Sequence, residues 1–221
     1  MRRTISNFFK ENRSLLLFIS LMLVFRSAVA DWNDVPTGSM KPTIVEGDRI
    51  LINKLAYDLK LPFSQQTLVK FTDPERNDIV IFESKVADKR LVKRVIGIPG
   101  DTVSLVKNQL RVNQETANYK VLATKDDYVL SEESIAGNKH LIRTKLQPGN
   151  AMQPTRANFR EITIPAGFYL MMGDNRDNSA DSRSIGLVPR EEIIGRSSKV
   201  AFSLNYDKYL MPRSERFLKA I

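Results

Sequence analysis

A short apolar run near the N-terminus separates this chain into a membrane-facing start and a longer, water-facing remainder. Residues 1–13 carry four basic side chains against one acid, and residues 14–25 are apolar apart from two serines. A basic flank before an apolar run predicts a cytoplasmic N-terminus, with the rest of the chain on the outer side of the membrane. We therefore predict a cytoplasmic N-terminus at 1–13 and a transmembrane anchor at 14–30.

The far end of this segment leaves two interpretations open. The uninterrupted run is shorter than the roughly 20 residues that span a bilayer, and it reaches the lower limit only if Arg26 extends its charge to the far interface. The stretch Ala28-Val29-Ala30 also fits the small-residue pattern of a cleaved signal peptide. An uncleaved anchor is the interpretation that we carry forward, with cleavage at this stretch as its alternative.

Composition narrows the class of protein and of chemistry. The 221 residues are 42% hydrophobic, which is enough for a folded core, and they include no cysteine. Disulfides, thiol nucleophiles and cysteine-ligated metals are therefore excluded. The net charge of +9 suits an anionic partner. The basic residues are scattered and form no nucleic-acid-binding motif, so we predict contact with membrane lipid and none with nucleic acid.

Beyond the anchor, short apolar runs alternate with turns rich in Gly, Pro, Asn and Asp. This pattern of apolar runs and turns predicts many strands and few helices. The predicted strands lie at 49–54, 79–82, 91–98, 102–106, 109–112, 162–172 and 195–204.

Three stretches lack a clear strand pattern. Residues 59–72 are predicted as an irregular loop. Residues 114–161 are more polar, and we predict an inserted subdomain with short strands. Residues 206–221 mix basic and apolar side chains, which fits either a basic amphipathic helix on a membrane or a polar terminus without fixed structure.

The stretch 35–43, VPTGSMKPT, presents Ser39 between Gly38 and Met40 with a proline on either side. Proline fixes φ and glycine permits unusual backbone, so the loop can display the hydroxyl to a substrate instead of using it in a turn. An ordinary turn is the alternative. A serine nucleophile needs a base, and the neighbours of the single histidine, His140, carry no signal of a Ser-His-Asp triad.

Lys93 is the remaining strong candidate for a base. On the strand 91–98 it shares a face with Leu91 and Val95. An ammonium among apolar side chains tends to lose its proton, and a lysine pKa lowered from about 10.4 to about 7–8 suits a general base. The alternative is an edge-strand lysine that reaches into water.

Residues 173–186, GDNRDNSADSRSIG, form the third informative stretch. Asx and Ser side chains can make such a loop rigid by bonding to its own backbone. A calcium loop starting at Asp177 is excluded, because its sixth position would be Ser182 in place of glycine and its twelfth would be Val188 in place of glutamate.

Together these stretches resemble the bacterial type I signal peptidases, membrane-anchored proteases with a Ser-Lys dyad. Four motifs occur in the family's order, and the resemblance covers the anchor and most of the chain except the region after about Gln114. The motifs are PTGSMKPT around Ser39, GDRILINK from Gly47, KRVIGIPGD from Lys93 and GDNRDNSADSR from Gly173.

The resemblance implies roles at the matching positions. Ser39 would be the nucleophile and Lys93 its general base. The Thr37 hydroxyl and the Ser39 N–H would form the oxyanion hole. The remaining implied residues are Ser179, which orients the lysine; Asp181 and Arg183, which support the site; and Val35, Met40 and Val92, which line shallow substrate pockets for the small side chains at −1 and −3.

The resemblance also implies a fold and a setting. The fold would be mostly β, an antiparallel catalytic domain at 31–113 and 162–221 with the second subdomain inserted at 114–161, preceded by one transmembrane helix. The protein would be a monomer without metal or cofactor. It would sit in the bacterial inner membrane as a single-pass protein, with its catalytic domain on the periplasmic side.

The implied activity is removal of signal peptides from exported preproteins. A Ser-Lys processing protease for another substrate, such as conjugative pilin, is an alternative. A self-cleaving repressor would need a DNA-binding domain where the apolar segment stands. A non-catalytic, membrane-tethered β module that binds partners is the alternative outside enzymes.

Overall fold

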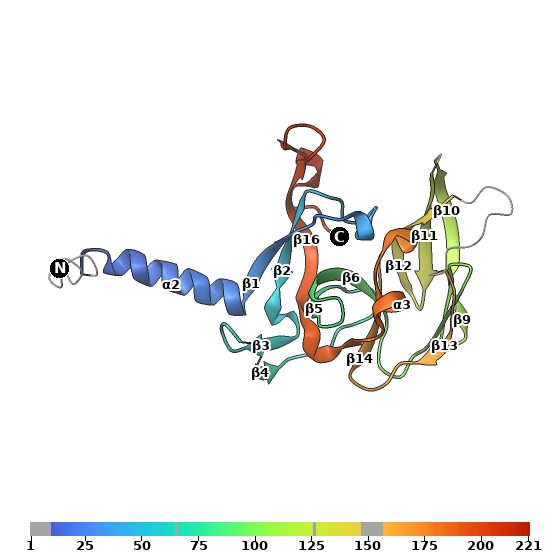
Figure 1. The fold of residues 1–221 in the computed structure, drawn as a ribbon, viewed down its shortest axis with the longest axis horizontal. Helices are drawn as coiled ribbons and strands as arrows, with labels where there is room; N and C mark the ends of the chain where they lie inside the picture. The colour runs from blue at the N-terminus through green and yellow to red at the C-terminus, as the bar shows by residue number, and fades with distance from the viewer. Residues whose placement is uncertain (1–9, 65, 126, 147–156) are drawn as a thin grey trace.

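The computed structural model describes residues 10–64, 66–125, 127–146 and 157–221, and most of their regular secondary structure is antiparallel strand. One helix, α2 (Arg13–Ala28), projects away from the strands and leads directly into β1 (Ala30–Asp34) (Figure 1). Apolar side chains on all sides of α2 are exposed, among them Leu15, Leu17 and Phe18. Across the described ranges, no helix combines the length and the apolar character that crossing a membrane requires.

The main sheet holds the middle of the molecule and is antiparallel throughout. Its strand order is β1-β2-β16-β5-β6-β14-β15, with β17 paired to β16. The four apolar residues at 79–82 are at most 2% exposed, which agrees with the predicted buried strand. The strands not yet located are β2 (Asp48–Asn53), β5 (Ile79–Ser84), β6 (Lys89–Gly97), β14 (Phe168–Met172), β15 (Val188–Pro189), β16 (Ile193–Asn205) and β17 (Met211–Pro212).

A second, four-stranded sheet has the order β13-β7-β8-β9. The strands predicted at 102–106 and 109–112 are confirmed and form a hairpin. Lys107 and Asn108 both have positive φ, as a tight two-residue hairpin turn requires. This sheet crosses the predicted boundary at residue 113, because β7 pairs with β13 and β8 with β9. The strands are β7 (Thr102–Val106), β8 (Gln109–Val112), β9 (Glu115–Thr116) and β13 (Phe159–Thr163).

The third sheet, β10-β11-β12, lies at the opposite end of the molecule from α2 (Figure 1). Its strands are β10 (Asn118–Thr124), β11 (Tyr128–Ile135) and β12 (Asn138–Lys145). They are longer than the short strands expected here. Glu133 and His140 occupy buried positions in this sheet, so its buried face does not read as apolar in the sequence.

Two predictions about local structure are wrong. Residues 59–72 form a hairpin of β3 (Asp58–Lys60) and β4 (Thr67–Lys70), in place of an irregular loop. All four side chains of β4 are exposed, so no alternation marked the strand.

The C-terminal residues 206–221 form neither an amphipathic helix nor an unstructured end. They contain β17 and a single 3-10 turn, Ser214–Arg216. The guanidinium of Arg216 is buried against the Asp48 carboxylate, with Nε 2.7 Å from Oδ1. That long-range ion pair holds residues 206–221 on the main sheet, and it could not be predicted from any local sequence pattern.

Candidate active site

Ser39 lies on a 3-10 turn, Gly38–Met40, between β1 and β2. Met40 and Val35 are buried in the core of the main sheet together with Ile44, which fixes the turn on both sides of the serine. The Ser39 side chain stays partly exposed. Its Oγ lies 2.8 Å from the Nζ of Lys93, so the structure brings the two predicted residues into direct contact.

Lys93 is placed by β6, in the middle of the sheet. Its side chain is 2% exposed, and its neighbours Leu91 and Val95 pack in one core cluster, as the alternation predicted. The second hydrogen-bond acceptor of Nζ is the backbone O of Val92, at 2.9 Å. Burial lowers the pKa of Lys93 to about 8, although the nearby carboxylate of Asp181 acts to raise it. A substantial fraction of the amine is therefore neutral near pH 8.

Asp181 and Arg183, which were predicted to support the site, pair with each other. Asp181 is fully buried and caps the short helix α3 (Ser182–Ile185). Its carboxylate accepts hydrogen bonds from Nε and Nη2 of Arg183, both at 2.8 Å, and from the backbone N–H of Gly173 at 2.9 Å. Burial acts to raise the pKa of Asp181, but these hydrogen bonds hold it below its ordinary value. A permanent anion here makes the loop rigid.

Ser179 is 2% exposed and hydrogen-bonds to the carboxylate of Asp181. It packs against Gly173, where a Cβ atom would collide with the Ser179 hydroxyl and with the backbone O of Ser39. Glycine at 173 is thus what lets the loop approach the nucleophile. The orienting role of Ser179 toward Lys93 stays a prediction.

Asn175 is a residue that sequence reasoning missed. Its side-chain amide donates to the backbone O of Gly38 at 2.9 Å, and its own N–H donates to the backbone O of Ser39 at 3.0 Å. Asn175 therefore fixes the backbone on which the nucleophile stands. The motif GDNRDNSADSR contained it, but an Asn in a polar loop is more often a turn former, and nothing local revealed its long-range partner.

A buried ion pair joins the same loop to β6 and to the serine loop. Arg94, next to Lys93, donates from Nε to Asp174 at 2.8 Å and from Nη2 at 2.7 Å. The Thr43 hydroxyl donates to the same carboxylate. Thr43 is the last residue of the stretch 35–43 that contains Ser39. This stretch, β6 and the loop at 173–186 therefore meet at the Asp174 carboxylate.

An open cleft of about 320 Å³ surrounds the dyad. Val35, Met40 and Val92, the residues predicted to form the substrate pockets, line it. So does Thr37, which is exposed at the start of the 3-10 turn. Ala180 and Asn178 form part of the wall contributed by residues 173–183. Ser39 lines the same space.

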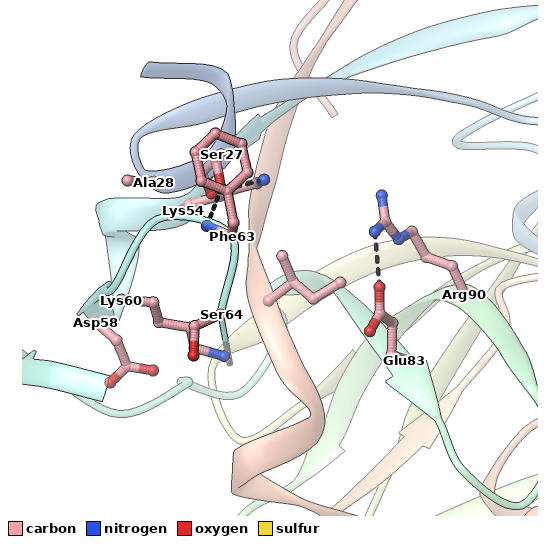
Figure 2. Close-up of a pocket in the computed structure, with 10 residues that line it drawn as sticks. Ser27, Ala28, Lys54, Asp58, Lys60, Phe63, Ser64, Glu83 and Arg90 are labelled. Atoms are coloured by element: carbon pink, nitrogen blue, oxygen red, sulfur yellow. Dashed lines mark hydrogen bonds and ion pairs between the residues drawn. The ribbon is translucent and has the colours of Figure 1, made fainter. Parts of the chain in front are cut away.

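A second cavity, of about 210 Å³, lies where α2 meets the β3–β4 hairpin (Figure 2). Lys54 donates from Nζ to the backbone O of Arg26 and of Ser27, and the Ser27 hydroxyl accepts the N–H of Phe63. These contacts tie the helix end to the sheet. Arg90 lines both this cavity and the cleft, so the cleft adjoins the α2 side of the molecule.

The single histidine belongs to a buried network away from the dyad. Arg176 donates from Nη1 to Glu133 at 2.7 Å, and Nε2 of His140 lies 3.2 Å from the same carboxylate. Glu133 and Arg176 are both fully buried. Arg183 also donates to the backbone O of Arg176. The network thus joins the β10–β12 sheet to residues 173–183, the segment that contains Ser179 and Asp181.

Comparisons with known proteins identify the family of this chain. The family model described as "Signal peptidase, peptidase S26" matches residues 8–202. The chain is 37% identical to a signal peptidase I of Pseudomonas aeruginosa, over 86% of this chain and 71% of that protein. It is 34% identical to a signal peptidase I of Pseudomonas fluorescens, with the same coverage. A solved signal peptidase I from Enterococcus faecalis is 24% identical, covers 57% of this chain and 98% of its own, and has a TM-score of 0.36.

Proposed function

From the premise that the chain belongs to the signal peptidase family, peptidase S26, we propose that Ser39 and Lys93 are its nucleophile and general base. The protein is a serine endopeptidase that removes signal peptides from preproteins. The observation that carries the proposal is the 2.8 Å contact between Lys93 Nζ and Ser39 Oγ, made by a lysine whose pKa burial lowers to about 8. A neutral amine at this distance can accept the hydroxyl proton.

The reaction then proceeds in two halves. Lys93 takes the proton as Ser39 Oγ attacks the carbonyl carbon of the −1 residue, and the oxyanion is held by the Ser39 N–H and the Thr37 hydroxyl. Collapse of this intermediate breaks the peptide bond, and Lys93 gives its proton to the leaving amine. Lys93 next deprotonates a water molecule that attacks the acyl-enzyme, and Ser39 recovers its proton as the cleaved signal peptide leaves.

Three further residues keep this dyad in place. Ser179 orients Lys93, while Asp181 and Arg183 hold the segment that carries Ser179. Their support is the buried carboxylate of Asp181, which receives two hydrogen bonds from the Arg183 guanidinium and one from Gly173 N–H.

Substrate choice follows from the cleft wall. Val35, Met40 and Val92 would form the shallow pockets for the side chains at −1 and −3. Val35 and Met40 are at most 5% exposed and packed in the core, so they cannot move aside for a large side chain. A preprotein with Leu at −1 is therefore expected to be cut poorly compared with one that has Ala.

Bacterial members of this family are associated with membranes, and we propose that α2 anchors this chain as a single-pass protein. The support is its exposed apolar surface and its flanking Arg13 and Arg26. The catalytic domain would lie on the periplasmic side of the inner membrane, as a monomer in contact with lipid. Protease treatment of spheroplasts tests this topology, because only a periplasmic domain would be digested.

The proposal is tested by cleavage of a model preprotein, in detergent with lipid, by wild type, Ser39→Ala and Lys93→Met. Wild type is expected to cut after a small residue, and both variants are expected to lose cleavage while their circular dichroism stays native. The wild-type kcat/KM should also fall about tenfold per pH unit below pH 8, because the base becomes protonated. Substantial turnover by either variant would contradict the dyad.

A further inference from the structure

We propose that a polar groove between Asn178 and the end of β12 binds the first residues of the mature protein, those that follow the scissile bond, and favours a carboxylate side chain there. The inference rests on the proposed function, since it concerns the same substrate in the same site. It adds a subsite and a charge preference on the side of the leaving amine.

The groove has a volume of about 520 Å³ and continues from the catalytic cleft. Asn178 is exposed and lines both spaces. The cleft also adjoins the α2 end of the molecule through Arg90, and the signal peptide arrives from that membrane-facing end. Because β10–β12 lie at the opposite end (Figure 1), the mature part of the substrate leaves toward the groove. Its other lining residues are Asp127, Arg143, Lys145, Leu146 and Asn175.

The groove is close enough to reach residues just after the cleavage point. Asn175 N–H donates to Ser39 O, and Asn175 forms a parallel β-bridge with Arg143. Two neighbouring backbones lie about 4.8 Å apart, so these two steps place Arg143 about 10 Å from Ser39. An extended chain covers that distance in about three residues. The side chains at +2 to +4 are therefore the ones that meet the groove.

The charges in the groove are not balanced. Arg143 pairs with the Asp127 carboxylate at 2.8 Å, and Asp127 is 71% exposed. The Arg143 guanidinium also lies over the Tyr128 ring, 3.7 Å from its centroid, which holds it at the wall. Lys145 uses its backbone N–H to bind Asp177, and its ammonium makes no ion pair within the ranges that the structure describes. Among the side chains that line the groove, one acid thus faces two cations, and a substrate carboxylate would balance this excess of positive charge.

The test uses three model preproteins that differ only at +3, with Glu, Gln or Lys, cut by the full chain in detergent with lipid. Wild type is expected to show a kcat/KM about fivefold higher for Glu than for Lys, with Gln between them, because exposed ion pairs change affinities by small factors. Lys145→Glu is expected to reverse the ranking. High salt should reduce the preference, since the charges are exposed.

Lys139→Glu is the matched control, because it makes the same charge change on β12 at a side chain 67% exposed and outside the groove. It should keep the wild-type ranking. Equal cutting of the three substrates by wild type, or an equal reversal by Lys139→Glu, would overturn the subsite while leaving the dyad intact. Failure of wild type to cut any of the three would instead contradict the proposed function.

Discussion

Two buried cations, Lys93 on β6 and Arg176 in the loop at 173–186, have opposite electrostatic environments. Arg176 is fully buried and hydrogen-bonds to the equally buried carboxylate of Glu133. Lys93 is 2% exposed, and no described residue forms an ion pair with it; its Nζ contacts Ser39 Oγ and the Val92 O. One cation is matched by an anion, and the other is left with neutral acceptors.

The residue types fit these two environments. A guanidinium stays charged in a protein, so a buried arginine requires a carboxylate partner. An ammonium can release its proton, so a buried lysine without a carboxylate becomes a base. The ion pair around Arg176 is expected to stabilise the structure, while a Lys93 without a carboxylate partner among the described residues fits the proposed proton transfer. Burial alone therefore does not identify a catalytic group, whereas burial without a counter-ion points to one.

The largest expected effect comes from exchanging the two cation types. Lys93→Arg keeps a positive charge but cannot supply a neutral base, so kcat/KM is expected to fall by about 10² to 10⁴-fold. Arg176→Lys keeps a cation beside Glu133 and is expected to retain more of the activity, with a loss of stability because lysine lacks the planar fork of arginine. Near-normal cleavage of a model preprotein by Lys93→Arg would show that position 93 does not need to supply a neutral base.

Removing the anion tests the other half of the comparison. Glu133→Gln leaves the Arg176 guanidinium buried without a charge partner, and urea unfolding at pH 7 is expected to show a loss of about 3–5 kcal/mol. Burial acts to raise the pKa of Glu133, but Arg176 and His140 hold it below its ordinary value. The stabilisation is therefore present above the unfolded-state pKa and is lost as the pH falls through the folded-state pKa.

The control for this variant is its neighbour Glu132, which is 33% exposed and pairs with Lys139 at 3.5 Å. Glu132→Gln removes the same charge at a solvated position and should cost less than about 1 kcal/mol. If the two variants lose similar stability, the buried pair would have no special role.

The features that could be predicted from the sequence are those with a local pattern, and the features that were missed depend on long-range pairings. Ser39 and Lys93 were predicted because a Pro/Gly-bracketed serine and a lysine on an apolar strand are local patterns, and the structure joins them. The main-sheet strands β2, β5, β6, β14 and β16 overlap strands that were predicted for the same reason, whereas β1, β15 and β17 were not predicted. Glu133, Asn175 and Arg216 were missed, since each gains its role from a partner more than 40 residues away. Polar side chains that become buried through such pairings look like surface residues in a sequence.

Removing the charge of Lys93 should raise the free energy of unfolding, whereas removing the charge of Glu133 should lower it. A pKa lowered from 10.5 to about 8 means that the folded state disfavours the charged form of Lys93 by about 3 kcal/mol below pH 8. This penalty disappears as the pH rises toward 10.5, because the unfolded chain then also loses its proton. Lys93→Met, which fills the same space, is expected to be more stable than wild type by up to about 3 kcal/mol at pH 6.

The difference should shrink at pH 10, and urea unfolding at the two pH values measures it. A matched variant is Lys199→Met, at an exposed position on β16 of the same sheet, which should change stability little at either pH. A Lys93→Met protein that is less stable than wild type at pH 6 would show that the hydrogen bonds of Nζ outweigh its desolvation.

The smallest effect is expected at His140, which separates the stabilising network from the chemistry. Its Nε2 contacts the Glu133 carboxylate, but Glu133 keeps two bonds from Arg176, and the buried Nδ1 has no hydrogen-bond partner among the described residues. His140→Gln should cost about 1 kcal/mol of stability or less and leave kcat/KM unchanged. Because this is the only histidine in the chain, a loss of cleavage as deep as that of Lys93→Met, measured on the folded variant, would transfer the role of base from the unpaired lysine to the network that surrounds Arg176.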